Sequence, residues 1–121
     1  MAEPIKTYLD LVAWQKAFQL GCKVHRLAGT LPEHERFGLI AQLRRDARSP
    51  ASQIANGYGR GNTNDYVWYL KQARGSLYDL DTQLRFSLEF EYINREQHEP
   101  VKSMLDECER VLGGLIRSLG G

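Results

Sequence analysis

The chain has 121 residues, of which 42% are hydrophobic and 26% charged, and it carries a formal net charge of +1. This length predicts one domain with its own hydrophobic core, and the composition is ordinary for a soluble globular protein. No stretch approaches the roughly 20 apolar residues of a membrane span, and the opening MAEPIKTYLD lacks the pattern of a secretory signal. We therefore expect a single domain over residues 1–121, located in the cytoplasm and without a membrane partner.

The first predicted helix covers residues 9–30. Apolar residues recur there at steps of three and four, which places them on one helix face: Leu9, Ala13, Ala17, Leu20, Val24 and Leu27. A second row widens this stripe: Leu11, Trp14 and Phe18. Thr7 and Asp10 have the spacing of a capping box, and Pro32 disfavours helical geometry at the residue before it. These signals bound the helix at both ends.

The second predicted helix covers residues 33–59, with this apolar row: Ile40, Leu43, Ala47, Ala51, Ile54 and Tyr58. Pro50 falls inside it, and a proline in a helix interior removes a hydrogen bond and clashes with the preceding turn. We therefore expect either a kink near residues 46–50 or two helices that meet there. The GYGRGN run at residues 57–62 predicts the end of the helix, because glycine readily adopts the left-handed cap conformation.

The third and fourth predicted helices cover residues 63–91 and 95–118. The third follows Asn62, a good N-cap residue, and has a heptad-like apolar row: Val67, Leu70, Ala73, Leu77, Leu80, Leu84 and Leu88. Asn94 and Gln97 have N-cap spacing before the fourth helix, whose apolar row is Val101, Met104, Cys108, Val111, Leu115 and Leu119. Four such helices joined by short loops predict an all-α, antiparallel up-down-up-down four-helix bundle.

Charge is unevenly distributed along the chain. Residues 41–75 carry six basic and two acidic side chains, whereas residues 76–99 carry six acidic and two basic ones. If the basic faces of the second and third helices adjoin, they form a patch for RNA phosphates: Arg45, Arg48, Arg60 and Lys71. Solvated helix faces account for the charge pattern equally well, and pairing with nearby carboxylates is the preferred interpretation for Arg44 and Arg74.

Large aromatic side chains are numerous for one small core. Tyr66, Trp68 and Tyr69 begin the third helix, and adjacent helix positions point about 100° apart, so at least one ring must face solvent or a partner. Exposed aromatic surface usually marks an interface. We therefore predict a homo-oligomer whose interface, in preference to a base-stacking surface, contains Trp14, Phe18, Trp68 and Tyr69.

The residues give little support for catalysis. The three histidines lie in different segments, and no cysteine and histidine cluster has zinc spacing. The GYGRG run follows a helix and lacks the Lys-Ser/Thr pair of a phosphate loop. Cys22 and Cys108 lie in apolar helical patterns, which favours free thiols in a reducing cytoplasm. We expect a protein without catalytic residues, metal or cofactor.

Several separated motifs resemble a known bacterial family: DLVAWQKAFQL (10–20), LPEHERFGL (31–39), QLRR (42–45), IANGYGR (54–60) and ARGSLYDL (73–80). The family is that of the four-helix proteins encoded in intervening sequences of 23S ribosomal RNA genes. The resemblance spans nearly the whole chain and implies a small cytosolic protein that forms a pentameric ring. It also implies kinship with accessory proteins of the reverse transcriptases of diversity-generating retroelements, which bind the polymerase and nucleic acid.

Within this resemblance, polar residues of the second and third helices form an expected structural polar cluster: Gln42, Arg44, Ser49, Gln53, Arg74, Ser76 and Asp79. Gln53 and Asp79 differ from the residues usual in the family at these places, and both can still supply hydrogen bonds. Two functions remain open. One is a scaffold for structured RNA or a nucleic-acid enzyme, and the other is an assembly module with protein partners alone.

Overall fold

The computed structural model describes residues 4–121, and these residues form helices and turns without strands. The four main helices are α1 Val12–Ala28, α2 Leu39–Tyr58, α3 Thr63–Glu89 and α4 Arg95–Ser118. Two short 3₁₀ helices precede α1 and α2: η1 Tyr8–Asp10 and η2 Glu33–Glu35. The predicted all-α four-helix fold is therefore confirmed.

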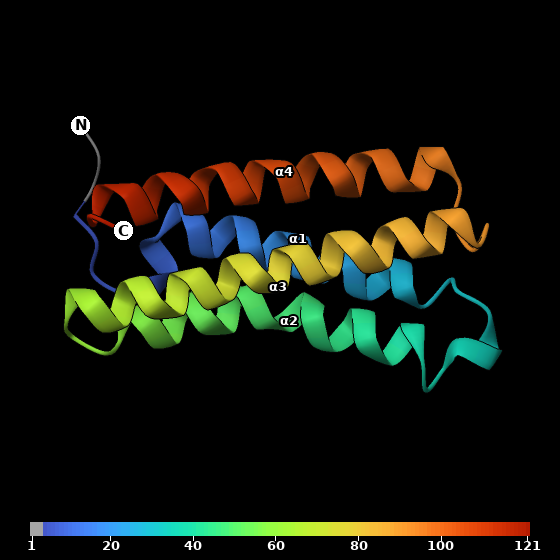
Figure 1. Cartoon of the computed structure of the whole chain (residues 1–121), viewed down its shortest axis with the longest axis horizontal. Helices are drawn as coiled ribbons and strands as arrows, with labels where there is room; N and C mark the ends of the chain where they lie inside the picture. The colour runs from blue at the N-terminus through green and yellow to red at the C-terminus, as the bar shows by residue number, and fades with distance from the viewer. Residues whose placement is uncertain (1–3) are drawn as a thin grey trace.

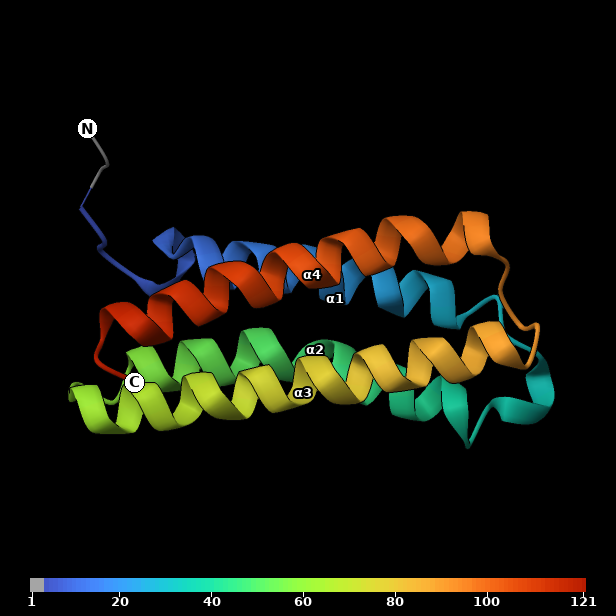
Figure 2. The same ribbon diagram turned by 45° about the horizontal axis from the view of Figure 1, so that its top comes forward.

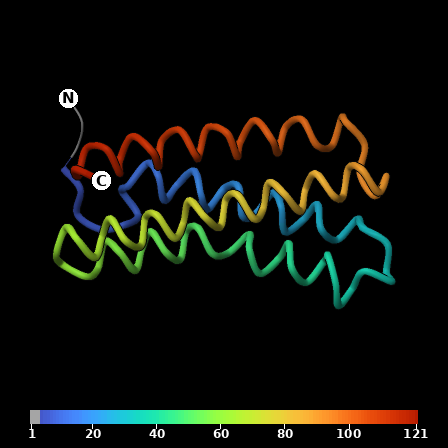
Figure 3. The backbone as a smooth tube through the Cα atoms, viewed as in Figure 1, coloured from blue at the N-terminus to red at the C-terminus, as the bar shows by residue number. Residues whose placement is uncertain are grey.

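The helices run up, down, up and down along one common direction (Figure 1). Each helix packs against its neighbours in the sequence, and α4 closes the ring by packing against α1. The rotated view shows α1 and α4 above α2 and α3, so the bundle consists of two helix pairs (Figure 2). The α2–α3 turn, the start of α1 and the end of α4 lie at the same end of the molecule (Figure 3).

The core is a column of aliphatic side chains contributed by all four helices. Its largest fully buried members are Leu20, Leu43, Ile54, Leu70, Leu77, Leu80, Leu84, Leu105, Leu112, Ile116, Val24 and Val101. The predicted row of α3 is confirmed, since its five central members are buried and its two end members half-buried. In α4 the buried row is Val101, Leu105, Cys108, Leu112 and Ile116. The other predicted members of the α4 row are half-buried at the edge of this face: Met104, Val111, Leu115 and Leu119.

The first two helices are shorter than predicted. Leu11 has extended backbone angles (φ −73°, ψ 124°), so the capping box of Thr7 and Asp10 closes the η1 turn and α1 begins after it. Gly38 (φ −105°, ψ −108°) likewise separates η2 from α2. The Glu35 side chain bridges this break, because its Oε1 accepts a hydrogen bond from the Leu39 amide at 3.2 Å. Such acceptors satisfy amides at a helix start that lack partners within the helix.

The proline inside α2 does not divide it. α2 is one helix over residues 39–58 with Pro50 buried in its interior, so the prediction of two helices meeting there is wrong. The ribbon changes direction near the middle of α2, consistent with a proline bend (Figure 1). The helix ends at Gly59 in right-handed geometry, and the left-handed residue of the turn is Gly61 (φ 82°).

We predict that the Glu35 carboxylate stabilises the start of α2 in a pH-dependent way. The hydrogen bonds that it accepts from the Leu39 amide and the Tyr92 hydroxyl lower the pKa of Glu35 below its ordinary value of 4.5. A lowered folded-state pKa adds stability above the ordinary pKa, and this contribution disappears as pH falls through the folded value. Thermal melts of the wild type and Glu35→Ala should therefore differ at neutral pH and converge in acid.

Candidate nucleic-acid interface

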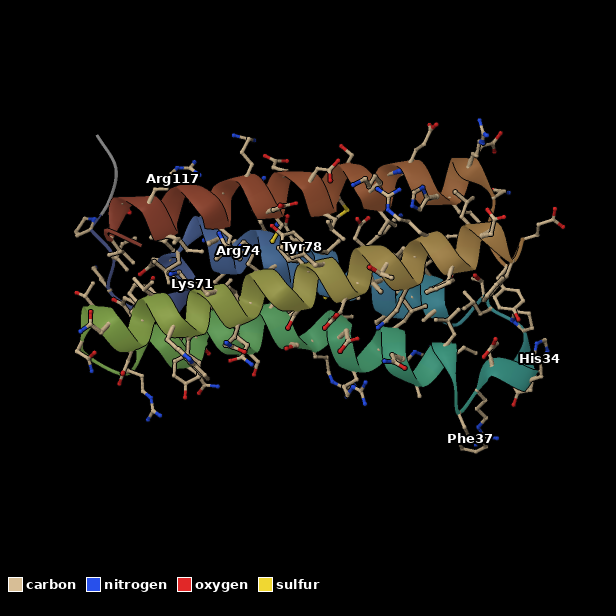
Figure 4. All side chains as sticks on the ribbon, in the orientation of Figure 1. His34, Phe37, Lys71, Arg74, Tyr78 and Arg117 are labelled. Carbon is tan, nitrogen blue, oxygen red and sulfur yellow. The ribbon has the colours of Figure 1, made fainter. Side chains whose placement is uncertain are left out.

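The structure does not bring the predicted RNA-binding residues onto one surface. Arg48 is exposed and lines an open groove between α1 and α2, beside Phe18 and Ala47. Arg45 is also exposed and lies 3.7 Å from the Asp46 carboxylate on the same helix. Lys71 lies on α3 one turn before Arg74, on the edge that faces α4 (Figure 4). The condition that the two basic faces adjoin is therefore not met.

The fourth predicted residue, Arg60, belongs to the turn between α2 and α3. Its guanidinium carbon lies 5.3 Å from the Tyr69 ring centroid, and its Nη2 donates to the Tyr69 hydroxyl at 3.0 Å. This cation–π arrangement anchors the α2–α3 turn on α3 and holds the positive charge of Arg60 at that end of the bundle. Arg60 thus has a structural role besides its positive charge.

The predicted pairing of Arg44 and Arg74 with carboxylates does not occur. Arg44 reaches α1 instead, where its Nε donates to the His25 carbonyl oxygen at 3.3 Å. Arg74 is half-buried between α3 and α4, and no carboxylate of residues 4–121 lies within ion-pair distance of it. Arg44 therefore links α1 to α2, and Arg74 carries its charge without an ion-pair partner among residues 4–121.

The predicted structural polar cluster is divided as well. Ser49 Oγ and Ser76 Oγ lie 2.8 Å apart across the α2–α3 interface, within hydrogen-bond distance. Four other members make no side-chain hydrogen bond within residues 4–121: Gln42, Gln53, Arg74 and Asp79. A second α2–α3 link, which sequence reasoning missed, is the hydrogen bond from Gln83 Nε2 to Asp46 Oδ2. Gln83 directly precedes Leu84 of the apolar row of α3 and is buried beside it, so the row itself gave no signal for this link.

A polar pocket between α3 and α4 contains residues that the sequence did not single out. Tyr78 of α3 donates to Glu109 Oε1 of α4 at 2.8 Å, and Arg74 lies in the same pocket. Arg110 and Arg117 line it from α4. The signal in the sequence is weak, because the pocket forms only when two helices distant in sequence pack together.

The predicted interface aromatics lie on two helices that do not pack together, α1 and α3. Trp14 and Phe18 stack with their ring centroids 5.0 Å apart, and Phe18 remains 51% exposed. Trp68 is 56% exposed, which confirms that at least one ring at the start of α3 faces outward, whereas Tyr69 is half-buried beneath Arg60. A further exposed pair was missed: Phe86 and Phe90 stack at 5.6 Å near the end of α3.

The histidines do not form a catalytic arrangement in the described part of the chain. His34 Nε2 lies 3.2 Å from the Tyr92 hydroxyl, which donates to Glu35 Oε2 at 2.9 Å. Because Glu35 also caps α2 and its pKa is lowered, the Glu35 carboxylate is poorly suited to accept a proton. Within residues 4–121 no three potential metal-ligating side chains gather, and no helix is long and apolar enough to cross a membrane.

The two cysteines are free thiols. Cys108 is buried in the core, and its burial raises the pKa of the thiol to about 12. Cys22 is half-buried and lines the groove between α1 and α2. A thiol with such a raised pKa is unreactive, so Cys108 acts as a small hydrophobic side chain.

Comparison with known proteins gives matches to a family model and to solved structures. The model of the 23S rRNA-intervening sequence protein family matches residues 9–114. Among solved structures, the chain is similar to a protein of unknown function from the S23 ribosomal protein family of Bacteroides thetaiotaomicron. The two are 23% identical, with a TM-score of 0.81 over 87% of this chain and 98% of that one, a likeness that supports the fold alone. No functionally curated protein matches.

Proposed function

Because the chain belongs to the 23S rRNA-intervening sequence protein family, we propose that it is a non-enzymatic, self-associating scaffold that binds structured RNA. The observation that supports this best is a group of ten lysines and arginines without a carboxylate partner among residues 4–121, which includes Arg48, Arg60, Lys71, Arg74 and Arg117. Such groups can neutralise phosphates without first losing an ion pair, and release of counterions then favours binding.

The positions of these cations suit shape recognition better than sequence recognition. Arg48 lies in the α1–α2 groove, whereas Lys71 and Arg74 lie on the α4 side of α3, so the contacts flank the bundle on two sides. Double-stranded RNA is recognised mostly through its backbone and 2′-hydroxyl groups. In a ring of identical subunits each weak contact is repeated, and the overall affinity rises without a new interaction.

Self-association is part of the proposal. Phe18 is exposed, stacks on the half-buried Trp14 and borders the α1–α2 groove, which has Arg26 and Arg48 at its sides. The opposite end of the bundle, formed by residues 28–40 and 85–100, carries six carboxylates against three arginines. An acidic end of one copy and a basic groove of the next are complementary, and such heterologous contacts close into rings. The ring of five subunits is a proposal taken from the family.

The alternative is an assembly module with protein partners alone. The exposed Phe86 and Phe90 pair at the acidic end favours it, because exposed aromatic rings are typical of interface cores. If the partner is a nucleic-acid enzyme that needs an accessory subunit, the protein would have both a protein partner and a role at nucleic acid, as the two hypotheses require. The free cysteines fit a reducing compartment, so we place the protein in the cytoplasm.

RNA binding should be weak, salt-sensitive and dependent on the exposed cations of α2 and α3. Fluorescence anisotropy with a labelled RNA hairpin over a series of salt concentrations measures it. Replacing both Arg45 and Arg48 by Ala should weaken binding, and each lost phosphate contact should reduce the slope of log affinity against log salt by about 0.7–0.9. Lys71→Ala should also weaken RNA binding.

Arg36→Ala is the matched control, because Arg36 is exposed but pairs with Glu33 at 3.6 Å at the acidic end of the bundle. It should leave RNA affinity unchanged. Absence of binding at low ionic strength, or a double Arg45 and Arg48 variant that binds like the wild type, contradicts the RNA proposal and leaves the protein-partner alternative.

A further inference from the structure

The pocket between α3 and α4 has more positive charge than its own acids compensate. It has a volume of about 340 Å³ and is lined by Arg74, Tyr78, Asp106, Glu109, Arg110, Gly113 and Arg117. Figure 4 shows Arg74 and Tyr78 on α3 and Arg117 on the adjoining α4, so the charges come from both walls. A hydrated anion fits in this space, since one water molecule in the liquid takes up about 30 Å³.

The acidic side chains of the pocket are engaged with groups other than its arginines. Glu109 Oε1 accepts the hydrogen bond of the Tyr78 hydroxyl at 2.8 Å. Asp106 Oδ1 accepts from Lys102 Nζ at 2.7 Å. Neither carboxylate forms an ion pair with the half-buried Arg74, and a guanidinium partly removed from water is stabilised by an anionic partner.

The α4 wall leaves space for a ligand beside Arg117. Gly113 and Gly114 have no side chains, and a Cβ built on Gly113 would lie 3.4 Å from Arg117 Nη1. The guanidinium thus lies against bare helix backbone. A cation in the last turn of a helix is also favoured by the helix dipole. That effect accounts for Arg117 but not for Arg74, which lies in the middle of α3.

We propose that this pocket binds one oxyanion of the phosphate class between Arg74 and Arg117. Guanidinium groups hold phosphate oxygens through paired, charge-assisted hydrogen bonds, and two of them on opposite walls can clamp one tetrahedral anion. Lys71, one turn from Arg74, adds attraction at the rim. Tyr78 acts as a positioning residue, because its hydroxyl engages Glu109, which would otherwise compete with the anion for the arginines.

The site does not depend on the RNA proposal, since free phosphate or a terminal phosphate of RNA offers the same chemistry. Isothermal titration calorimetry of the full chain with inorganic phosphate, against chloride at equal ionic strength, tests it directly. The wild type should bind phosphate with saturation. Arg74→Gln and Arg117→Gln should each weaken binding at least about tenfold, the loss expected for charge-assisted hydrogen bonds.

Arg36→Gln is the matched control, because it removes an exposed guanidinium outside the pocket, at the acidic end of the bundle, and should leave phosphate binding intact. Tyr78→Phe retains the ring and should weaken phosphate binding by freeing Glu109. Equal heats from phosphate and chloride, or a double Arg74 and Arg117 variant that binds like the wild type, overturn the proposal. Tighter binding of a 5′-phosphorylated RNA than of its unphosphorylated form assigns the pocket to RNA ends, and equal binding assigns it to free phosphate.

Discussion

Gly21→Ala should destabilise the protein, whereas Gly75→Ala, the same change in another helix, should not. A Cβ on Gly21 would lie 2.5 Å from the carbonyl oxygen of Ala47, so α1 and α2 must move apart to admit one methyl group. The obstacle is backbone, which cannot rotate away as a side chain can. We expect a loss of about 1–3 kcal/mol, the usual cost of overpacking a well-packed contact.

Gly75 is the internal control, since it is exposed in the middle of α3 and a Cβ there meets no atom of residues 4–121 within 4 Å. Alanine is favoured over glycine in a helix by up to about 1 kcal/mol, so this variant should be at least as stable as the wild type. Urea and thermal unfolding followed by circular dichroism measure both effects at one protein concentration, because association changes apparent stability. Two variants that both gain stability would contradict the close α1–α2 contact.

Gly21 also shows what the sequence could and could not predict. The four apolar rows predicted four helices because each row repeats within a single segment of chain. Close contacts between helices produce no repeating pattern within one segment. Gly57 was interpreted as part of a helix terminator, yet it is buried within α2, and a Cβ there would lie 2.7 Å from Tyr69 Cβ of α3. The role of each glycine depends on the opposite helix.

The candidate site likewise depends on how the helices pack against one another. The spacing of Lys71 and Arg74 correctly predicted that they are neighbours, because both lie on one helix. The assumption that Arg48 joins them required knowledge of how α2 is rotated about its axis. That rotation is fixed by packing, and the structure turns Arg48 towards α1 instead. In α4 Val101 and Cys108 of the predicted apolar row are buried, whereas Met104, Val111 and Leu115 each lie one position before a buried residue, an error that a tolerant 3.6-residue period allows.

The second large effect concerns self-association, and Phe18→Glu should weaken it strongly. Phe18 is half-exposed, stacks on Trp14 and borders the α1–α2 groove that we propose as the contact with the next subunit. Burial of one phenylalanine contributes about 1.5–3 kcal/mol, and in a ring the change recurs at every interface. A carboxylate there would in addition repel the acidic end of the neighbouring copy.

Light scattering coupled to size exclusion should show a wild-type oligomer at micromolar concentration and a much smaller species for Phe18→Glu. Val12→Glu is the matched control, because Val12 is 54% exposed on the same helix but lies outside both the groove and the acidic end. It should retain the wild-type mass. A wild-type monomer would refute association, a dimer would refute the ring, and equal masses for the wild type and Phe18→Glu would place the interface elsewhere. Since Phe18 lies outside the core, unchanged circular dichroism distinguishes lost association from unfolding.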